Sequence, residues 1–246
     1  MRRLVASLAC RNNGSRLYAK PLQFLDVPGR ISVLDHLVRL LRSERSIAEV
    51  VLGVSVGTAN EIFHEIARDL GLQSIRGSEK DVLQRLIQCA KQGQGTDVFR
   101  VTSESPFTYF EAIAECWRRH VEHRNDVTVV DGLPDGCNFE IFTLEALERS
   151  HARGDERHRS EFCSLYIREH RDEFQVEEVP VPAHLLRGDL RLTIDYPEDL
   201  IVCRRVYEAL SSLAPRLPLA RIVGVLDADP ALKALVAPYA QPSRLY

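Results

Sequence analysis

A loop near the start of the chain is the first feature whose residues could do chemistry. Residues 11–22 read RNNGSRLYAKPL and follow directly on the apolar run LVASLAC. Arg11, Arg16 and Lys20 supply positive charge there, and Gly14 lets backbone N–H groups approach phosphate oxygens closely. The spacing matches neither of the common glycine-rich phosphate-binding motifs. A polyphosphate site and a plain cationic surface loop are therefore equally favoured by this segment alone.

Two isolated carboxylates form the second candidate. Glu104 follows the apolar stretch DVFRV, and Asp195 follows RLTI. Carboxylates at the ends of two strands suit Mg²⁺, which takes oxygen ligands, retains waters and shares substrate phosphates. Asp195 also stands two residues before Pro197, where an aspartate could equally cap a helix. Metal ligation and helix capping both stay open at Asp195.

The segment RGSEKDVLQR holds a third candidate, because Ser78 and the backbone beside it could contact a nucleoside. A helix cap also explains Ser78, since Ser78 and Asp81 stand at the two positions of a capping box. On these residues alone the cap is favoured. The sequence shows no Ser/His/Asp or Cys/His arrangement, so a covalent intermediate is not expected.

Composition limits the class of protein. The chain has 246 residues, a hydrophobic content of 45% and a formal net charge of -3. These values fit one large globular domain, or a domain with an appendage, and argue against a general binder of nucleic acid or membrane surfaces. The six cysteines include no CxxC pair, which leaves a zinc site unsupported. The apolar run near the N-terminus is too short for a convincing signal peptide or a membrane span, so we expect a cytoplasmic protein.

Strand-like and helix-like segments alternate along most of the chain. This order predicts an α/β fold with a mostly parallel central sheet and helices on both faces, similar to a Rossmann fold. We expect strands at 3–9, 49–56, 72–77, 97–106 (with its exit loop), 126–131, 138–143 and 189–197. We expect helices at 31–43, 58–71, 78–92, 110–123, 144–153, 160–174 and 197–212.

The composition changes near the prolines that follow residue 213. We expect residues 1–213 to form one domain and residues 214–246 to form an appendage, with a strand or short helix and then a helix, that packs on the domain or on a dimer partner. Ligands of sheets of this class bind beyond the carboxyl ends of the strands. The cationic loop, Glu104 and Asp195 are therefore expected to meet at that edge.

Five short motifs, in order along residues 3–210, resemble those of the cytidylyltransferases of the spore-coat-polysaccharide type. These enzymes are relatives of the CMP-sialate and CMP-deoxyoctulosonate synthetases. The family's R-x-x-S-[ST]-R-L-P-G-K-x-L stands here as RNNGSRLYAKPL, and its F-R-G-S-E-D-D-V-L stands as IRGSEKDVL. Its R-x-T-G-D-x-P is RVTSESP, its P-D-G-x-D-x-E-x-F is PDGCNFEIF, and its R-L-T-x-D-T-P-E-D-L is RLTIDYPEDL. Each motif is weak alone, but the conjunction is fairly specific.

The resemblance implies a nucleotide-diphospho-sugar transferase fold, a homodimer, and transfer of CMP from CTP to an acceptor oxygen with release of pyrophosphate. Arg11, Arg16 and Lys20 would grip the triphosphate as the catalytic clamp, and Glu104 and Asp195 would hold Mg²⁺. Further nucleotide contacts would come from Gly14, Ser15, Arg76, Gly77, Ser78, Thr102 and Ser103, and acceptor contacts from Asp135, Asn138, Glu140, His158 and Arg159. Attack at the α-phosphorus needs alignment and charge neutralisation more than covalent help, which fits a cluster of cations.

Departures from the family pattern bear on the acceptor. Glu104 and Ser103 replace an aspartate and a glycine, Asn138 replaces the first aspartate of the D-x-E pair, and Tyr18 and Ala19 replace Pro-Gly. A less acidic and shortened acceptor region with nearby arginines suits a small anionic acceptor. A phosphonate or a phosphorylated small molecule therefore competes with a sugar acid, and the product would activate a precursor of cell-surface polysaccharide, such as capsule, or of its decoration.

Two alternatives remain beside this hypothesis. A glycosyltransferase of related fold would use a ready-made nucleotide sugar, but such enzymes usually carry an Asp-x-Asp metal motif, which SESP and CNFE do not supply. A non-catalytic nucleotide-binding relative is favoured only by the replacements at Glu104 and Asn138. Neither nucleic acid nor membrane is expected as a partner.

Overall fold

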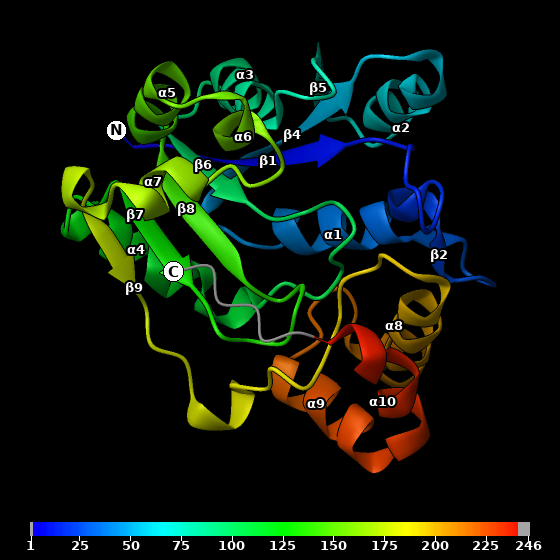
Figure 1. The fold of residues 1–246 in the computed structure, drawn as a ribbon. Coiled ribbons are helices and arrows are strands. Elements are labelled where there is room, and N and C mark those ends of the chain that lie inside the picture. Colours follow the sequence, from blue (N-terminus) through cyan, green and yellow to red (C-terminus); the bar gives the residue numbers. More distant parts are fainter. Residues whose placement is uncertain (1, 241–246) are drawn as a thin grey trace.

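A seven-stranded sheet runs through the computed structural model, which describes residues 2–240 (Figure 1). The strand order is β5-β4-β1-β6-β8-β7-β9. All neighbours pair in parallel except β8, which is antiparallel to β6 and to β7. The strands are β1 Leu4–Cys10, β4 Ile47–Ser55, β5 Gln73–Gly77, β6 Asp97–Arg100, β7 Val127–Val130, β8 Phe139–Thr143 and β9 Val176–Glu178. The prediction of an α/β fold with a mostly parallel sheet is confirmed.

The helices lie on both faces of this sheet. Buried residues of α3, α5 and α7 form one apolar cluster, and those of α1, α2, α4 and α8 belong to a larger one. The helices are α1 Val33–Arg42, α2 Ile62–Asp69, α3 Val82–Gln92, α4 Ile113–Glu122, α5 Leu144–Arg153, α6 Glu156–Arg159, α7 Leu165–Glu169, α8 Pro197–Leu210, α9 Leu219–Ala228 and α10 Pro230–Val236. A small hairpin of β2 Phe24–Asp26 and β3 Ile31–Ser32 precedes α1. Short 3-10 turns lie at Lys20–Leu22, Thr58–Asn60, Phe110–Ala112, Arg171–Glu173, Ala183–Leu185, Ser211–Leu213 and Ala237–Tyr239.

The first two strands of the large sheet show why the local sequence gives this architecture. β1 and β4 pair in parallel, and most of their residues are buried. A strand covered by helices on both faces must be apolar on both, which is why LVASLAC and VVLGV read as continuous runs and not as alternating patterns. α1 begins with a capping box in which Ser32 and Asp35 satisfy each other's backbone N–H groups.

The helix after β5 begins later than the sequence pattern predicts. The expected capping box of Ser78 and Asp81 is wrong, because Asp81 itself caps α3 by accepting from the backbone N–H of Gln84 at 2.8 Å. Ser78 Oγ accepts from the Asp81 N–H at 3.2 Å, which is one half of the expected box, but this bond lies before the helix and not at its cap. Residues 78–81 therefore form the connection that leads the chain from β5 to α3.

Two further predictions on elements are wrong. The segment 189–197 is not a strand, since its one bridge joins Arg191 to Asp135 and its backbone otherwise bonds to loops, as in Ile194 N–H to Glu104 O at 3.0 Å. The expected helix 160–174 reduces to α7 and a 3-10 turn, and the strand β9 follows it. Little in the sequence indicated β9, because two of its three residues are glutamates and the strand lies at the sheet edge.

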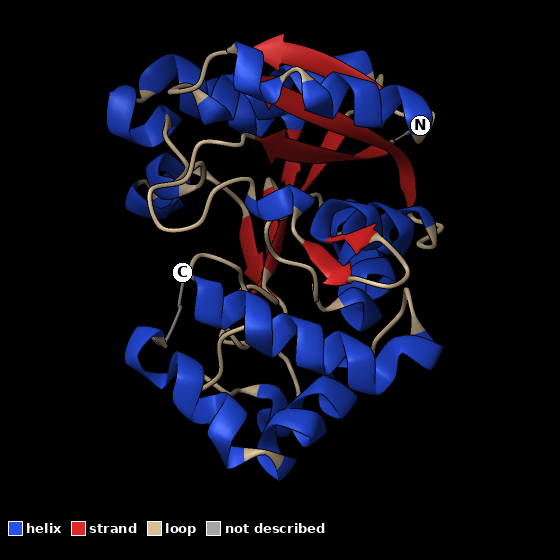
Figure 2. Ribbon diagram, turned by 90° about the vertical axis from the view of Figure 1, so that its right-hand side faces the viewer, coloured by secondary structure: helices blue, strands red, loops and turns tan. Residues whose placement is uncertain are grey.

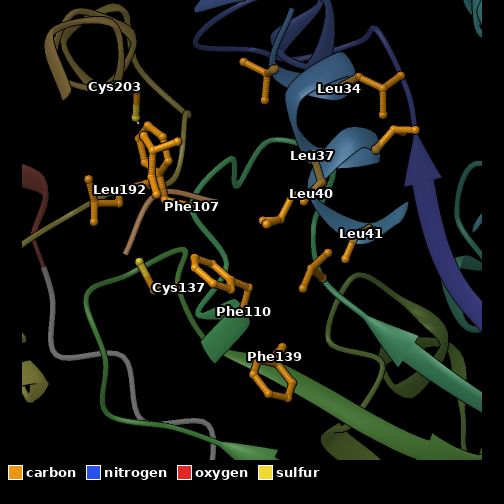
Figure 3. Packing of buried hydrophobic residues seen from close by; sticks show 14 of the residues in the cluster. Leu34, Leu37, Leu40, Leu41, Phe107, Phe110, Cys137, Phe139, Leu192 and Cys203 are labelled. Carbon is orange, nitrogen blue, oxygen red and sulfur yellow. Dashed lines mark hydrogen bonds between the residues drawn. The ribbon is translucent and has the colours of Figure 1, made fainter. Parts of the chain in front are cut away.

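The C-terminal residues pack on the rest of the chain. α9 and α10 contact α8, and Figure 2 shows helices gathered below the sheet in this part of the molecule. Leu219, Ile222 and Leu226 of α9 belong to the same apolar cluster as α1. Figure 3 shows this cluster reaching from Leu34 and Leu37 of α1 to Cys203 of α8. The described part of the appendage is thus two helices that share the domain's core. No helix within residues 2–240 is both long and apolar enough to cross a membrane.

Candidate active site

The site lies at the carboxyl ends of the parallel strands, where loops from distant parts of the sequence meet. The loop after β1, the loop after β6 and the segment that precedes α8 line a cavity of about 350 Å³. A narrower cavity of about 90 Å³ adjoins it and shares part of the lining. The residues that line both are Arg11, Lys20, Arg100, Val101, Thr102, Glu104 and Glu161. We call the first the wide cavity and the second the narrow cavity.

The cationic loop reaches into the wide cavity. Lys20 Nζ lies 2.5 Å from Asp195 Oδ1, and Arg16 Nη2 lies 3.2 Å from the same oxygen. The Arg16 guanidinium also stacks over the Tyr196 ring at 4.8 Å. Arg11 Nη2 lies 3.2 Å from Glu161 Oε2 on the opposite wall. The three cations that the sequence singled out therefore converge, and two of them meet one carboxylate.

The backbone of the loop explains two of its small residues. A Cβ atom on Gly14 would lie 2.4 Å from the carbonyl oxygen of Leu17, so only glycine lets the loop close on itself there. Ala19 adopts a left-handed conformation with φ 52° and donates its N–H to Asn12 O at 2.9 Å. Ala19 stands where the resemblance places a glycine, which adopts this conformation without strain.

Asp195 is not the cap of α8. Tyr196 occupies the N-cap position, and Asp199 accepts from the backbone N–H groups of both Asp195 and Tyr196, at 2.8 and 2.9 Å. The Asp195 carboxylate instead faces the wide cavity. Burial opposes its ionisation, but Lys20, Arg16 and Arg191 together hold the pKa of Asp195 below its usual value. The side chain is thus an ionised carboxylate that three cations position.

Glu104 lines the same cavity, but its pKa is shifted in the opposite direction to that of Asp195. Burial raises the pKa of Glu104, Asp195 raises it further and Lys20 lowers it. Ser103 Oγ donates to the Glu104 carboxylate at 3.2 Å and to Ala9 O at 2.9 Å. Asp195 and Glu104 lie close enough for the charge of Asp195 to raise the pKa of Glu104. Two such carboxylates form an oxygen donor set suited to a divalent cation, and a bound cation would favour the ionised form of Glu104. The residues present therefore fit Mg²⁺.

The acceptor-side residues lie along the far wall of the wide cavity. Glu140 on β8 is buried and pairs with Arg100 Nη1 at 2.6 Å. Asn138 Oδ1 accepts from the Leu133 N–H at 3.1 Å, and Asp135 pairs with Arg191. Burial raises the pKa of Asp135, while Arg191 opposes the shift. The predicted residues Asp135, Asn138 and Glu140 are thus brought to the same cavity as Lys20.

The other predicted residues divide between positions outside the two cavities and positions in their lining. Arg76 pairs with Glu61 at 2.6 Å on the surface, and Ser78 bonds to the α3 cap. His158 is buried with its Nε2 2.9 Å from Glu169 Oε2, and Arg159 donates to the carbonyls of His151 and Gly154. Of the remaining predictions, Gly14, Thr102 and Ser103 line the narrow cavity, Ser15 lines the outer side of the cationic loop, and Gly77 packs against Arg85. The roles of all these residues stay predictions.

Three arginines of the site were missed. Arg191 is buried and binds Asp135, Asp195 and Asp199 at once, with Nε 3.0 Å from Asp199 Oδ1. Arg100 and Arg191 each open one of the resembling motifs, RVTSESP and RLTIDYPEDL, so their positions were a usable signal. Arg85 carried no such signal, because an arginine in a helix usually belongs to a solvated face.

Comparison with known proteins places this geometry in a family. The sequence profile of a family described as Cytidylyltransferase matches residues 8–223. An uncharacterized protein of Methanocaldococcus jannaschii is 26% identical over 231 residues, which cover 94% of this chain and 93% of the relative. The spore coat polysaccharide biosynthesis protein SpsF of Bacillus subtilis is 24% identical over 227 residues, which cover 91% of this chain and 93% of the relative.

Two solved structures have a similar fold. A cytidylyltransferase from Leptospira borgpetersenii superposes with a TM-score of 0.85 at 20% identity, and the match covers 100% of each chain. CMP:2-keto-3-deoxy-manno-octonic acid synthetase, in a complex with CTP, superposes with a TM-score of 0.63 at 11% identity over 86% of this chain and 99% of the other. The expected nucleotide-diphospho-sugar transferase fold is thereby confirmed.

Proposed function

The chain belongs to the cytidylyltransferase family and is a nucleotidyltransferase, and we propose that it transfers CMP from CTP to a small anionic acceptor in an Mg²⁺-dependent reaction that releases pyrophosphate. The observation that supports this proposal best is the convergence of Lys20, Arg16, Glu104 and Asp195 on one cavity. The family membership favours this reaction over the glycosyltransferase and the non-catalytic relative.

The chain's own residues account for the charge that the reaction must manage. An acceptor oxygen attacks the α-phosphorus of CTP, the bond to the β-phosphate oxygen breaks, and pyrophosphate leaves with that electron pair. Lys20, Arg11 and Arg16 would neutralise the triphosphate and the charge that develops on the leaving group. Glu104 and Asp195 would hold Mg²⁺, which when bound supplies further neutralisation of phosphate oxygens.

The free protein keeps these groups in place before substrate arrives. Lys20 contacts Asp195 and lies near enough to Glu104 to lower the pKa of Glu104. Arg191 fixes the other oxygen of Asp195. Groups that are already oriented need no reorganisation at the moment of reaction, which is where positioning contributes to rate.

The acceptor class follows from the far wall of the wide cavity. Asn138 is neutral, and the charge of Glu140 is offset by Arg100, while Arg11 and Arg16 keep side chains that are about half exposed. Phe162 adds an exposed apolar group to the lining. These features support a small acceptor with a phosphonate, phosphate or carboxylate group. Activation of a cell-surface polysaccharide precursor such as capsule, a cytoplasmic location and a homodimer belong to the same proposal.

The direct test is a pyrophosphate-release assay with CTP, Mg²⁺ and a panel of phosphonates, phosphomonoesters and sugar acids. We expect release only with CTP, only with a matching acceptor, and a loss of at least 100-fold on metal chelation. Lys91, which pairs with Glu148 on the surface, provides the control variant Lys91→Ala, which should keep full activity. Turnover that is unaffected by chelation would refute the Mg²⁺ dependence. If none of the acceptors in the panel supports pyrophosphate release, the acceptor class is refuted.

A further inference from the structure

An aromatic contact joins the C-terminal appendage to the cationic loop. Tyr239, in the 3-10 turn Ala237–Tyr239, stacks on Tyr196 with the ring centroids 4.0 Å apart and an angle of 11° between the planes. The Arg16 guanidinium packs on the same Tyr196 ring, 4.8 Å from its centroid, and Arg16 Nη1 donates to the Tyr196 hydroxyl at 3.2 Å. Two ring contacts therefore link these three residues, which we call the arginine–tyrosine stack.

The appendage holds Tyr239 in this place. α10 is anchored by its buried residues Leu232 and Val236, and Asp229 caps its first turn. The turn that carries Tyr239 follows α10 directly. α10 also contacts α8, and Tyr196 occupies the N-cap position of α8. Both tyrosines are thus held by one pair of packed helices.

Both tyrosines fall outside the pattern of the family. The family match ends at residue 223, so Tyr239 lies beyond it. The motif that RLTIDYPEDL resembles has a threonine where Tyr196 stands. A threonine offers no ring on which a guanidinium or a second tyrosine could stack. Membership in the family therefore does not account for the arginine–tyrosine stack.

Arg16 needs a partner other than Asp195 if it is to bind phosphate. Its side chain is about half exposed, and its Nη2 lies 3.2 Å from Asp195 Oδ1. An Asp195 carboxylate engaged with Mg²⁺ would have less charge to offer Arg16. The contact with Tyr196 uses the face of the guanidinium and leaves most of its N–H donors free. This contact can therefore persist while Arg16 binds a triphosphate.

We propose that Tyr239 is a positioning residue for the nucleotidyl transfer: it holds the Tyr196 ring against Arg16 and so keeps the guanidinium in the wall of the wide cavity. A long side chain such as arginine loses much rotamer freedom when it binds a ligand, and a side chain that is already ordered loses less. The appendage thus acts on the site without touching the substrate. The inference rests on the proposed binding of a triphosphate by the cationic loop.

The test is a double-mutant cycle between Tyr239 and Arg16. Calorimetry measures the affinity for tripolyphosphate, in the presence of Mg²⁺, of the wild type, Tyr239→Ala, Arg16→Ala and the double variant. We expect Tyr239→Ala to weaken binding about three- to fivefold, the factor that a cation–π contact contributes at an exposed site. In the Arg16→Ala background the same substitution should change the affinity by less than about 1.5-fold.

Three further variants separate positioning from stability. Tyr239→Phe keeps the ring and should retain the wild-type affinity. Tyr239→Leu keeps apolar volume without a ring, so it should bind as weakly as Tyr239→Ala and serves in its place if that variant does not fold. The matched control is His170→Ala, which removes a ring stacked on Tyr166 at 4.1 Å and 17° and lines neither cavity. It should lower the melting temperature to a similar extent and leave the affinity for tripolyphosphate unchanged.

Three results would overturn the proposal. An equal loss of affinity from Tyr239→Ala with and without Arg16 would mean that the tyrosine stabilises the site as a whole. A Tyr239→Phe variant as weak as Tyr239→Ala would mean that the ring is not the group that acts. A wild type that does not bind tripolyphosphate would leave Arg16 with no phosphate to meet. Failure of the proposed function looks different, because tripolyphosphate would bind and the cycle would show coupling, but no acceptor would give pyrophosphate release from CTP.

Discussion

Charged side chains are buried in opposite ways at the amino ends and at the carboxyl ends of the strands, which we call the amino edge and the carboxyl edge. At the amino ends of the strands, the fully buried Asp97 accepts from Arg2 Nε at 3.0 Å and from Thr96 Oγ1 at 2.6 Å, and lies 3.2 Å from His120 Nε2. Burial opposes its ionisation, but these hydrogen bonds hold the pKa of Asp97 below its usual value. At the carboxyl ends, Arg85 is buried as deeply without a counter-ion among the residues that the structure describes.

This difference separates two uses of buried charge. A buried charge whose partners are all within the fold makes the fold sensitive to the loss of any one of them, because the remaining group is left uncompensated in a low dielectric. A charge with partners missing destabilises the free protein and gains most when a ligand supplies them. The carboxyl edge has groups of the second kind, and the amino edge has a network of the first kind.

The largest effect is expected from the cations and carboxylates of the carboxyl edge. Lys20→Ala and Asp195→Ala should each lower kcat/KM for CTP by 100-fold or more, since removing one group that stabilises transition-state charge has about that effect. The melting temperature should change little, because Arg16 and Arg191 remain beside Asp195 in the first variant, and Arg191 keeps Asp135 and Asp199 as partners in the second. Steady-state pyrophosphate assays measure the loss of kcat/KM, and thermal melts measure the change in melting temperature. Near-full turnover in both variants would remove the distinction between the two edges.

The amino edge should give the converse result. Asp97→Ala is expected to lower the free energy of unfolding by about 3–5 kcal/mol, since it leaves Arg2 and His120 without their buried partner. The activity of the molecules that remain folded should stay within about twofold, because Asp97 is at the opposite ends of the strands. Urea unfolding measures the first quantity, and Asp69→Ala on the exposed surface of α2 is the control. A loss of activity without a loss of stability would contradict this assignment.

His36 on α1 distinguishes an unsatisfied group from an unsatisfied charge. It is 1% exposed between Phe107 and Tyr207, and its Nε2 has no hydrogen-bond partner in the described part of the chain, as with Arg85 Nε. Burial lowers the pKa of His36 to about 4, with Arg39 adding to the shift, so the side chain is neutral at pH 7. A histidine can lose its charge on folding, whereas an arginine cannot.

The pH dependence of stability follows from that lowered pKa. Above pH about 6.5 the side chain is neutral in both states, and below it the unfolded chain binds the proton first. Stability should therefore fall as the pH drops from about 6.5 to about 4, by on the order of 3 kcal/mol from this group. Urea unfolding across this range should show a shallower slope for His36→Leu than for the wild type. Equal slopes for His36→Leu and the wild type would mean that His36 is protonated in the folded state as readily as in the unfolded state.

Local pattern predicted the parts of the molecule that local physics determines. The parallel strands were visible as continuous apolar runs, and α1 was visible from its helical spacing. The convergence of the cationic loop with Glu104 was also predictable, because the parallel strands β1 and β6 deliver their exit loops to one edge. Asp195 reaches the same cavity although the segment before it is not the expected strand.

The missed features depend on contacts between distant segments. Arg85 of α3 packs against Gly77 of β5, where a Cβ atom would lie 2.6 Å from Arg85 Cγ, and β9 is identified by its pairing with β7 and not by its own composition. At Asp195 the sequence left metal ligation and helix capping both open. Only the path of the backbone before α8 places Asp199 under the N–H groups and Asp195 in the cavity.

The smallest expected effect comes from replacing residues of positive φ by glycine, which tests whether the carboxyl edge also stores backbone strain. Ala19 in the cationic loop and Arg124, between α4 and β7 at the amino edge, both have positive φ, 52° and 55°. Relief of the left-handed conformation by glycine is worth about 1–2 kcal/mol at either position. Ala19→Gly also removes a methyl group on a residue that is 8% exposed, which costs about 0.8 kcal/mol. Arg124→Gly on the exposed surface has no such offset.

Urea unfolding should therefore show a gain of about 1 kcal/mol for Arg124→Gly and a smaller gain for Ala19→Gly. A larger gain for Ala19→Gly, accompanied by a rise in KM for CTP, would show that strain in the cationic loop contributes to nucleotide binding, and the two edges would then differ in backbone conformation as well as in charge.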